Sequence, residues 1–599
     1  MIKLSDYMAQ FFEQQGVKDV FMLSGGGCMH LINSFGSSKK MKYWCLHHEQ
    51  SVSMATEAYS RAKNDLCVAV VTCGPGATNT ITGLLGAYQD SSPCVFLSGQ
   101  AKRKNTVRNS GLPGLRQLGQ QEVDIIPIVS SITKYAVMIN DPNEIRYHLE
   151  KAVYLAKNGR PGPVWIDVPL DVQNSMIDET ALNGYEPEET IGAVNPEDID
   201  YLIDLLNKSE RPVIVAGHGV RIANACKELR DIVEKYSIPV VNSFLGIDVL
   251  ESDHPCSIGR IGIKGTRAGN FTMQNADLLI SIGSRLSVSS IGFQPELFAR
   301  GAKVVVVDID EVEHKKDMVA IDRLIISDAK LFINALLPQM ESRVEKNYKN
   351  WLDKADKWKD AWPVCLPQYD NDTEGINYYK MIDLLNKYMT ADMPVVSDAG
   401  SAFYVTSQSV NLKKGQRYIP SGALATMGYT LPAAIGVAIS DLSKTVVGIV
   451  GDGSLQQNIQ ELIVLKAHNL PVKLVVMNND GYLSIRQTQR KFFKDNFVAE
   501  GPHSGVIFPK TEDISKAYGL DYYYIDTIKK AEELLPVIFS KSGPSVIEVK
   551  TLPFQEIIPT SSSAMKKDGT MVSKPLEDMY PFLDRETFLN EMIVKSVEE

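Results

Sequence analysis

Short runs of β-branched and aliphatic residues alternate with longer amphipathic stretches through most of this chain, and this alternation limits the fold more than any other feature. Each run has the length of a buried strand, and a stretch such as Glu49 to Lys63 has the length and periodicity of a helix. The repeated order of strand, helix and strand is typical of a parallel sheet covered by helices. The sequence therefore predicts an α/β protein. The predicted strands are Val68 to Thr72, Val95 to Ser98, Val164 to Asp167, Pro212 to Ala216, Pro239 to Val241, Asp277 to Ile282, Lys303 to Asp308, Pro394 to Ser397, Thr445 to Val450, Val472 to Met477 and Ser545 to Val549.

Two interruptions divide the alternation into three units. Residues 179–198, ETALNGYEPEETIGAVNPED, are acidic, rich in turn formers and without periodicity, as in a linker. A Lys- and Trp-rich helix over Asn347 to Trp362 closes the second unit. The first and third units have similar sizes, which allows a pseudo-symmetric pair with a cleft between them. We expect three doubly wound parallel-sheet domains and an irregular polar tail, at residues 1–180, 190–345, 370–555 and 556–599.

Charge and composition exclude several classes of function. The net charge is −10 and no block of Lys or Arg occurs, so we expect no binding to nucleic acid or to an anionic membrane. Residues 1–16 have the pattern of an amphipathic helix rather than of a signal peptide, and no apolar stretch is long enough to cross a membrane. The eight cysteines include no C-x-x-C pair, which favours reduced core thiols. These features predict a cytoplasmic enzyme that acts on small molecules.

The most informative segment covers two predicted strands and the residues that follow them. The first strand runs into Gly451-Asp452-Gly453-Ser454, and the second ends at Asn478-Asn479-Asp480-Gly481. An Asp at a strand end, an Asn side chain and a nearby carbonyl are oxygen ligands suited to Mg²⁺. Free N–H groups around Ser454 and Leu455 would face a diphosphate. A Gly-Asp-Gly sequence is by itself often only a turn, but its place between a buried strand and a helix favours the metal site.

This segment, GDGSLQQNIQELIVLKAHNLPVKLVVMNND, resembles the thiamine-diphosphate fingerprint, and in particular that of the acetolactate synthase family. The resemblance extends over about residues 1 to 555, so it implies pyrimidine-binding, middle and diphosphate-binding domains. It also implies that Asp452, Asn479 and the carbonyl of Gly481 hold Mg²⁺.

The same family requires a glutamate that forms a hydrogen bond with the aminopyrimidine ring of the cofactor. The stretch KYWCLHHEQSVSMATEAYSRAK resembles the family segment that carries this acid, and Glu49 occupies its position. The alternative is an ordinary acid at a helix start, where the helix dipole favours it. Beside the metal motif we prefer the catalytic interpretation.

Further matches extend the implied cofactor site. Gly25-Gly26-Gly27 resembles the loop on the thiazolium side, and TCGPGATNTITGLLGAYQDSSP is close to the family pattern. Met427 stands where a large apolar side chain supports the bent cofactor, although an apolar Met is by default core packing. The resemblance implies that the cofactor-binding residues are Gly26, Gly27, Glu49, Gly74, Asn79, Ala399, Gly400, Ser401, Ala425, Met427, Asp452, Gly453, Ser454, Asn479, Gly481, Tyr482 and Leu483.

The substrate side departs from the family pattern. Gln121 and Lys134 fall where the family places a catalytic Gln and Lys that face the substrate. Gln120 replaces a usual Phe, Thr488 replaces a Trp of the acceptor pocket, and Ala402 replaces a His near the diphosphate. The loss of two aromatic side chains predicts a wider and more polar acceptor pocket.

The middle unit carries part of a pattern for FAD, which in this family performs no net redox chemistry. The acids that usually follow the Ser-Arg element are replaced by Ser287 and Val288, so an empty or ADP-binding domain is the alternative. The residues implied for FAD are Gly217, Gly219, Gly265, Gly283, Arg285 and Asp308.

The resemblance implies decarboxylation of pyruvate and transfer of the two-carbon unit to an acceptor carbonyl, with pyruvate or 2-oxobutyrate as acceptor. The tail TSSSAMKKDGTMVSKPLEDMYPFLDRETF resembles relatives in surface-polysaccharide pathways, where a nucleotide-linked keto sugar would be the acceptor. The sequence is also compatible with a pyruvate oxidase, in which flavin takes electrons from the carbanion, and with a catalytically silent nucleotide-binding relative. By analogy with the family, the active form is a homodimer or a homotetramer.

Overall fold

The computed structural model describes residues 1–187, 192–565 and 571–597. Residues 188–191 of the predicted linker, and residues 566–570 and 598–599 of the predicted tail, lie outside this description. Within it, the chain forms three six-stranded sheets, and every neighbouring pair of strands in them is parallel.

The amino-terminal sheet has the order β3-β2-β4-β5-β7-β6, so the chain enters next to one edge and its topological switch lies between β2 and β4. A short antiparallel pair, β1 (Ile2–Lys3) and β8 (Met176–Ile177), joins the two ends of the domain. The strands of the sheet are β2 (Asp19–Met22), β3 (Lys42–Cys45), β4 (Cys67–Val71), β5 (Cys94–Gln100), β6 (Tyr135–Met138) and β7 (Val164–Pro169). The helices are α1 (Leu4–Gln14), α2 (Met29–Gly36), α3 (Glu49–Lys63), α4 (Pro75–Thr78), α5 (Ile81–Gln89), α6 (Val107–Ser110), α7 (Ile125–Val129), α8 (Ile145–Lys157) and α9 (Leu170–Gln173).

The middle sheet has the order β11-β10-β9-β12-β13-β14, with its topological switch between β9 and β12. Its strands are β9 (Pro212–Ala216), β10 (Val240–Asn242), β11 (Ser257–Arg260), β12 (Leu278–Ile282), β13 (Lys303–Asp308) and β14 (Arg323–Ile326). Its helices are α10 (Pro196–Lys208), α11 (His218–Ile222), α12 (Cys226–Tyr236), α13 (Arg267–Gln274), α14 (Val288–Ile291), α15 (Ala329–Arg343) and α16 (Lys349–Ala361).

The carboxyl-terminal sheet has the order β16-β15-β17-β18-β20-β19, and its switch lies between β15 and β17. Its strands are β15 (Val395–Ser397), β16 (Tyr418–Pro420), β17 (Val446–Gly451), β18 (Val472–Asn478), β19 (Asp521–Ile525) and β20 (Ser545–Lys550). Its helices are α17 (Tyr378–Tyr388), α18 (Gly400–Ser409), α19 (Thr430–Ser440), α20 (Asp452–Leu455), α21 (Leu462–Ala467), α22 (Leu483–Phe493), α23 (Thr511–Ala517) and α24 (Ile528–Ser540).

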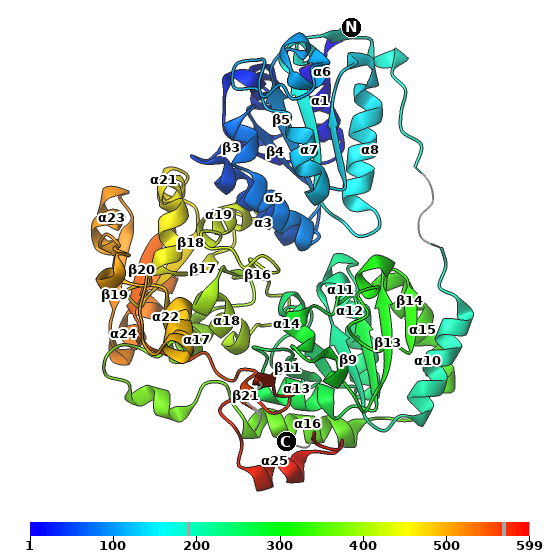
Figure 1. Ribbon diagram of the computed structural model, residues 1–599, viewed down its shortest axis with the longest axis vertical. Coiled ribbons are helices and arrows are strands. Elements are labelled where there is room, and N and C mark those ends of the chain that lie inside the picture. Colours follow the sequence, from blue (N-terminus) through cyan, green and yellow to red (C-terminus); the bar gives the residue numbers. More distant parts are fainter. Residues whose placement is uncertain (188–191, 566–570, 598–599) are drawn as a thin grey trace.

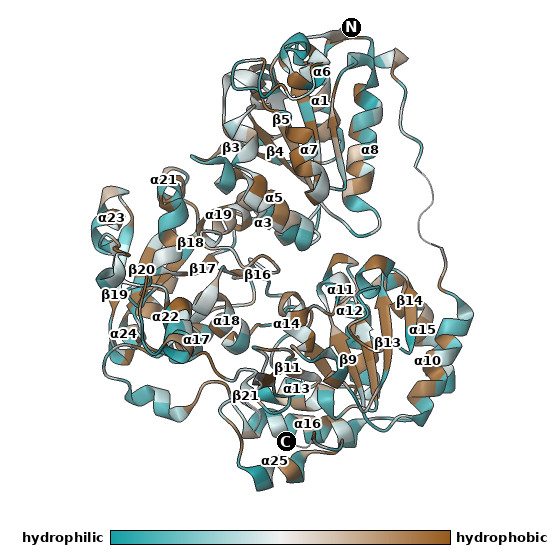
Figure 2. Cartoon of the chain, in the orientation of Figure 1, coloured by the Kyte–Doolittle hydropathy of each residue, from teal (hydrophilic) through white to brown (hydrophobic). Residues whose placement is uncertain are grey.

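The three domains meet around a common centre, with the amino-terminal domain at the top of Figure 1, the middle domain in green and the carboxyl-terminal domain in yellow and orange. The strands carry the most hydrophobic residues, and the outer helices turn polar faces to solvent (Figure 2). The first and third domains join through α3 and α19. Gly436 of α19 has no side chain, and a Cβ there would lie 2.2 Å from the carbonyl oxygen of Ala55. The missing side chain lets the two helices pack closely.

The tail after β20 returns across the middle domain and ends beside α16, where α25 (Arg585–Glu591) lies at the bottom of Figure 1. A hairpin of β21 (Ser563–Met565) and β22 (Met571–Ser573) precedes it. Buried Glu577 pairs with Arg300 at 2.7 Å and accepts a hydrogen bond from Gln274. The tail is therefore anchored by a buried charge.

The predicted α/β class with three doubly wound parallel-sheet domains is confirmed. All eight cysteines are free thiols. In the described part of the chain, none of the helices is long and apolar enough to cross a membrane.

Candidate active site

Two strand ends meet at the carboxyl edge of the third sheet. Because β17 and β18 are adjacent and parallel, the residues that follow them come close together. The N–H of Gly481 donates to Oδ2 of Asp452 at 3.1 Å, and the N–H of Gly453 donates to Oδ1 at 2.8 Å. Burial raises the pKa of Asp452 to about 6. Asn479 is 7% exposed, and its Oδ1 finds no hydrogen-bond donor among the described residues. A buried carboxylate and a buried amide oxygen thus lie on neighbouring loops.

Two glycines in these loops are required by the packing around them. A Cβ on Gly453 would lie 2.3 Å from the ring of Tyr482, which packs edge-on against Phe508. Gly481 has φ +146°, and a Cβ there would lie 2.1 Å from the carbonyl oxygen of Glu500. A side chain at either position would push the loops apart. Buried Leu483 then starts α22.

Ser454 links these loops to the end of a third strand. Its hydroxyl donates to buried Asp398, which follows β15, and accepts from the N–H of Gly428 at 2.8 Å. Burial raises the pKa of Asp398 to about 6. The same carboxyl accepts from the N–H of Ala399 at 2.6 Å. The predicted positions 399–401 therefore open α18 directly beside the predicted position Ser454.

The segment predicted to lie under the cofactor connects the third domain to the first. Ala425 has a left-handed backbone, with φ +47°, and Met427 is half-buried. Buried Asp90 of the first domain accepts from the N–H groups of Gly422 at 3.0 Å and Ala423 at 2.9 Å. A carboxylate from another domain thus fixes the start of this segment.

In the first domain, Glu49 lies at the start of α3 and is half-buried. Its Oε2 accepts a hydrogen bond from Nδ2 of Asn79 at 3.0 Å. Its Oε1 lies 3.5 Å from the place that a Cβ on Gly76 would occupy. One carboxyl oxygen is thereby oriented, and the other lies beside Gly76, which packs closely against Thr72, since a Cβ there would come within 2.6 Å of Cγ2 of Thr72.

Glycine loops surround this acid at the carboxyl ends of β2 and β4. The N–H of Gly27 donates to Oγ1 of Thr72 at 3.1 Å, while nothing lies within 4 Å of a Cβ built on Gly26. Gly74 has φ +62°, and a Cβ there would lie 2.2 Å from the carbonyl oxygen of Gln121. The predicted residues Gly26, Gly27, Gly74, Asn79 and Gln121 are therefore neighbours of Glu49 or of one another at one edge of the sheet.

Lys134 lies elsewhere. It precedes β6, an edge strand, whereas Glu49 follows β3, the opposite edge strand, and the strands are parallel. Its ammonium donates to the carbonyl oxygens of Asn158 and Arg160 at 2.6 and 2.7 Å. Burial lowers the pKa of Lys134 to about 8. Within one chain, the fold thus separates Lys134 from Glu49.

The residues around Asp452 in the third domain and those around Glu49 in the first domain are linked indirectly, through the start of α3. Oγ of Ser51 donates to Asn458 at 3.0 Å, and Nδ2 of Asn458 donates to Gln50 at 3.2 Å. The N–H of His47 donates to Glu461 at 3.0 Å. None of the hydrogen bonds found among the described residues joins Glu49 itself to the loops of Asp452 and Asn479.

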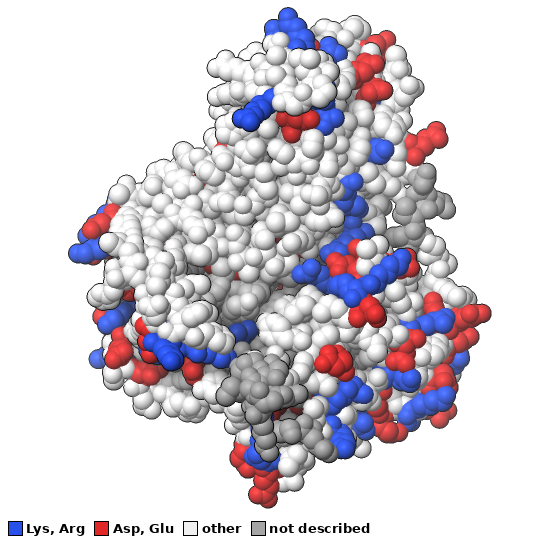
Figure 3. Space-filling model, in the orientation of Figure 1, with Lys and Arg blue, Asp and Glu red and all other residues white. Residues whose placement is uncertain are grey.

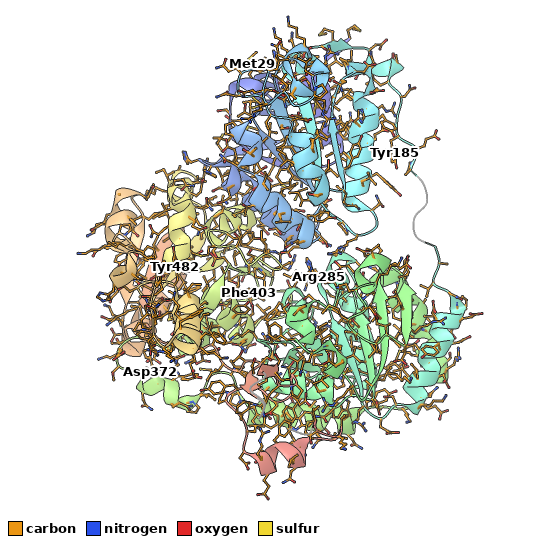
Figure 4. All side chains as sticks on the ribbon, viewed as in Figure 1. Met29, Tyr185, Arg285, Asp372, Phe403 and Tyr482 are labelled. Atoms are coloured by element: carbon orange, nitrogen blue, oxygen red, sulfur yellow. The ribbon has the colours of Figure 1, made fainter. Side chains whose placement is uncertain are left out.

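A cleft of about 300 Å³ lies where the three domains meet. It is lined by four of the residues predicted for FAD, which are Gly219, Gly283, Arg285 and Asp308. Figure 4 shows Arg285 on the side of the middle domain that faces the other two, with Phe403 and Tyr482 across from it. The other two predicted residues do not line the cleft.

Gly217 and Gly265 have packing roles instead. A Cβ on Gly217 would lie 2.1 Å from the carbonyl oxygen of Gly283. A Cβ on Gly265 would lie 2.5 Å from the carbonyl oxygen of Arg260. Both glycines allow close contact between backbone segments.

Two residues of the site were missed from the sequence. Asp398 directly follows a predicted strand, and a strand-end acid is a signal that could have found it. Arg486 of α22 contacts the loop of residues 479–482, but a charged residue in an amphipathic helix usually faces solvent, so no sequence signal marked it.

The residues present fit thiamine diphosphate and a divalent cation. The unpartnered Oδ1 of Asn479 and the buried carboxylate of Asp452 are hard oxygen donors, which suit Mg²⁺. A buried polar atom without a partner is costly, and a cation would satisfy it.

Comparison with known proteins points to the same chemistry. The family described as the thiamine pyrophosphate enzyme N-terminal TPP binding domain matches residues 2–128. The central domain of these enzymes matches residues 199–336, and their C-terminal TPP binding domain matches residues 398–549.

Relatives that match over most of the chain are about 30% identical to it. The acetolactate synthase large subunit of Lactococcus lactis subsp. lactis (strain IL1403) is 31% identical, over 94% of this chain and 95% of that protein. The acetolactate synthase of Arthrospira platensis is 30% identical over 91% of this chain and 93% of its own length. The acetolactate synthase isozyme 1 large subunit of Escherichia coli (strain K12) is 29% identical, with coverages of 93% and 95%. With its fold, its paired strand-end oxygens and this similarity over nearly its full length, the chain belongs to the acetolactate synthase family of thiamine-diphosphate-dependent enzymes.

Proposed function

We propose that this enzyme decarboxylates pyruvate and joins the remaining two-carbon unit to the carbonyl group of a second 2-oxo acid, with pyruvate as the first acceptor to test. The proposal rests on the contact between the two loops. The N–H of Gly481 donates to Oδ2 of Asp452 at 3.1 Å, and the amide oxygen of Asn479 in the same loop has no hydrogen-bond donor among the described residues. This arrangement supplies the ligands for the cation that anchors a diphosphate.

Each residue has a separate task in this proposal. Asp452, Asn479 and the carbonyl of Gly481 hold Mg²⁺, and the N–H groups at the start of α20 face the diphosphate. Bound thiamine diphosphate supplies the electron sink for loss of CO₂. Asn79 orients Glu49, so that Oε1 holds a proton at the aminopyrimidine side.

We propose a homodimer, or a dimer of dimers, as the active form. Figure 3 presents a broad face with few charges that extends over the first and third domains, whereas charged side chains gather over the middle domain. A large surface with few charges is typical of a buried interface. Glu49 is half-buried in one chain, and a second copy would complete its burial. Sedimentation of the purified protein measures this directly.

We also propose that the cleft at the centre of the chain binds FAD. Gly219 and Gly283 line the cleft beside the switch between β9 and β12, where an open α/β sheet usually binds its ligand. Asp308 at the end of β13 is placed to accept hydrogen bonds from a ribose. The absorption spectrum of the purified protein tests this.

We also propose that the enzyme is cytoplasmic. Its eight cysteines are all free thiols, as is usual in a reducing compartment.

The test incubates the purified protein with Mg²⁺, thiamine diphosphate and pyruvate, and identifies the carbon products by mass. We expect CO₂ and 2-acetolactate. A Glu49→Gln variant keeps the size of the side chain but loses the acid, and should lower the rate by at least the roughly 10²-fold typical of a lost general acid–base group. Glu144→Gln, an exposed acid of the same domain, is the matched control and should keep the parent rate. Equal rates for Glu49→Gln and the parent would refute the role of Glu49.

A further inference from the structure

The side chain of Arg486 contacts the loop of residues 479–482, although the function proposed above gives Arg486 no role. Arg486 lies in the first turn of α22 and is 6% exposed. It follows closely after residues 479–482, which we call the metal loop because the proposed function places the cation there. Its Nη2 donates to the carbonyl oxygen of Asp480 at 2.9 Å, and its Nη1 donates to that of Asn479 at 3.2 Å. Nη1 also reaches the carbonyl oxygen of Pro553 at 2.7 Å. One guanidinium therefore holds two consecutive peptide groups of the loop.

Glu500 completes this clamp from the other side. Its Oε2 accepts from Nε of Arg486 at 2.5 Å, and its side chain is buried. Its backbone carbonyl accepts the N–H of Tyr482 at 2.7 Å. The hydroxyl of Ser504 donates to Oε1 of Glu500 at 3.3 Å. The loop over residues 479–482 is thus fixed by both members of a buried ion pair.

The clamp sets the direction of the groups that face the cation. With the carbonyls of Asn479 and Asp480 turned toward Arg486, the N–H of Gly481 points to Asp452. The side-chain oxygen of Asn479 is then free to act as a ligand. Without the clamp, these peptide groups could rotate, and ordering them would cost conformational entropy when the metal binds.

Charge balance favours the same assignment. An isolated guanidinium this close to a divalent cation would repel it. The carboxylate of Glu500 neutralises Arg486, so the clamp brings hydrogen-bond donors to the loop without adding net positive charge. Arg is suited to this task because its planar group donates in several fixed directions, whereas the ammonium of Lys has no such fork.

We propose that Arg486 is a positioning residue for the metal loop, and that together with Glu500 it sets the affinity of the enzyme for its divalent cation. The inference rests on the proposed function, since it assumes that Asp452 and Asn479 hold the cation. It assigns no contact between Arg486 and substrate or cofactor.

The experiment measures binding of Mn²⁺, as a paramagnetic substitute for Mg²⁺, by the EPR signal of the free ion in the presence of thiamine diphosphate. Arg486→Lys should weaken Mn²⁺ binding by about 10- to 100-fold, the usual effect of removing a group that orients a metal ligand. At saturating Mg²⁺ the variant should recover most of the parent kcat, because only positioning is lost. Arg490→Lys is the matched control, since Arg490 lies one turn further along α22 and pairs with exposed Asp495.

Four outcomes are distinguishable. A parent enzyme that binds no Mn²⁺ with thiamine diphosphate contradicts the proposed function itself. A parent that binds, with an Arg486→Lys variant of equal affinity and unchanged circular dichroism, overturns only the inference. If Arg486→Lys does not fold, Glu500→Gln decides, because it leaves the guanidinium without its counter-charge and should also weaken Mn²⁺ binding. Unchanged affinity in a folded Glu500→Gln variant would likewise overturn the clamp.

Discussion

Replacing Asn479, whose amide oxygen has no donor among the described residues, should change the affinity for the cation much more than the stability of the metal-free protein. An Asn479→Ala variant removes an acceptor that has no donor among the described residues. A buried acceptor without a partner costs about 1–3 kcal/mol, so its removal offsets the loss of packing. We expect the metal-free variant to unfold within about 1 kcal/mol of the metal-free parent.

The cation changes this comparison. At a ligand concentration of about 100 times the parent Kd, binding adds about 2.7 kcal/mol to the free energy of unfolding. If the variant binds about 10- to 100-fold more weakly, the same concentration adds only about 1.4 to 0.4 kcal/mol. Urea unfolding with and without Mg²⁺ and thiamine diphosphate measures both states. The reasoning is refuted if the metal-free variant loses more than about 2 kcal/mol, or if both proteins gain equally from the ligands.

Asn478 provides the matched control for this experiment. Its amide donates to Glu548 at 2.5 Å, and its Oδ1 accepts the N–H of Asp480 at 2.9 Å, so both ends of the side chain have partners. Asn478→Ala should therefore lose about 1–3 kcal/mol in the metal-free state. The contrast between adjacent asparagines distinguishes a ligand from a structural residue.

Two further predictions concern buried carboxyls. Burial raises the pKa of Asp167 from 3.8 to about 7, so the folded chain favours the protonated acid. The free energy of unfolding should therefore fall by up to roughly 4 kcal/mol as the pH rises from about 4 through 7. Asp167→Asn should flatten this dependence between about pH 4 and 7 in urea unfolding; an unchanged slope would contradict the assignment. Arg61 lies 3.3 Å from Glu57 and 3.5 Å from Asp90, all buried, so Arg61→Met should cost about 3–5 kcal/mol by leaving both acids without their counter-charge. Restoration of part of that loss by a second substitution, Glu57→Gln, would support this explanation, and further destabilisation would contradict it.

The interior of each sheet could be predicted from the sequence because its strands are continuous apolar runs. β9 and β13 match their predicted bounds at both ends, and both are flanked by strands on each side. An edge strand such as β19, DYYYI, is half-buried and has a neighbour on one side only, so no continuous apolar run marks it. β14 likewise exposes one of its positions and half-exposes two more. The fold class could therefore be predicted, whereas the width of each sheet could not.

The site divides in the same way. Asp452 directly follows β17 and Asn479 directly follows β18, so local sequence was enough to bring them together. The clamp of Arg486 and Glu500 depends on a loop that turns back over the strand ends, and 14 positions separate the two residues. Lys134 could not be placed in this way. Its match to a family position does not show whether it precedes or follows a strand. It precedes β6, so in the same chain it lies at the opposite end of the strands from Glu49, which follows β3.

The two halves of the site differ in how complete they are within one chain, and this difference has a physical reason. Asp452 and Asn479 are buried within one chain, where hydrogen bonds from Gly453 and Gly481 hold Asp452 and the buried Arg486 holds the loop of Asn479. Among the described residues, the side chain of Glu49 accepts one hydrogen bond, from Asn79, and it is half-buried in a single chain. We propose that a second copy of the chain completes this half of the site, and the broad face with few charges in Figure 3 is a candidate surface for the association of two copies. Dimer formation and catalysis should therefore be lost together on dilution, while the affinity of the metal loops for Mn²⁺ alone should change much less.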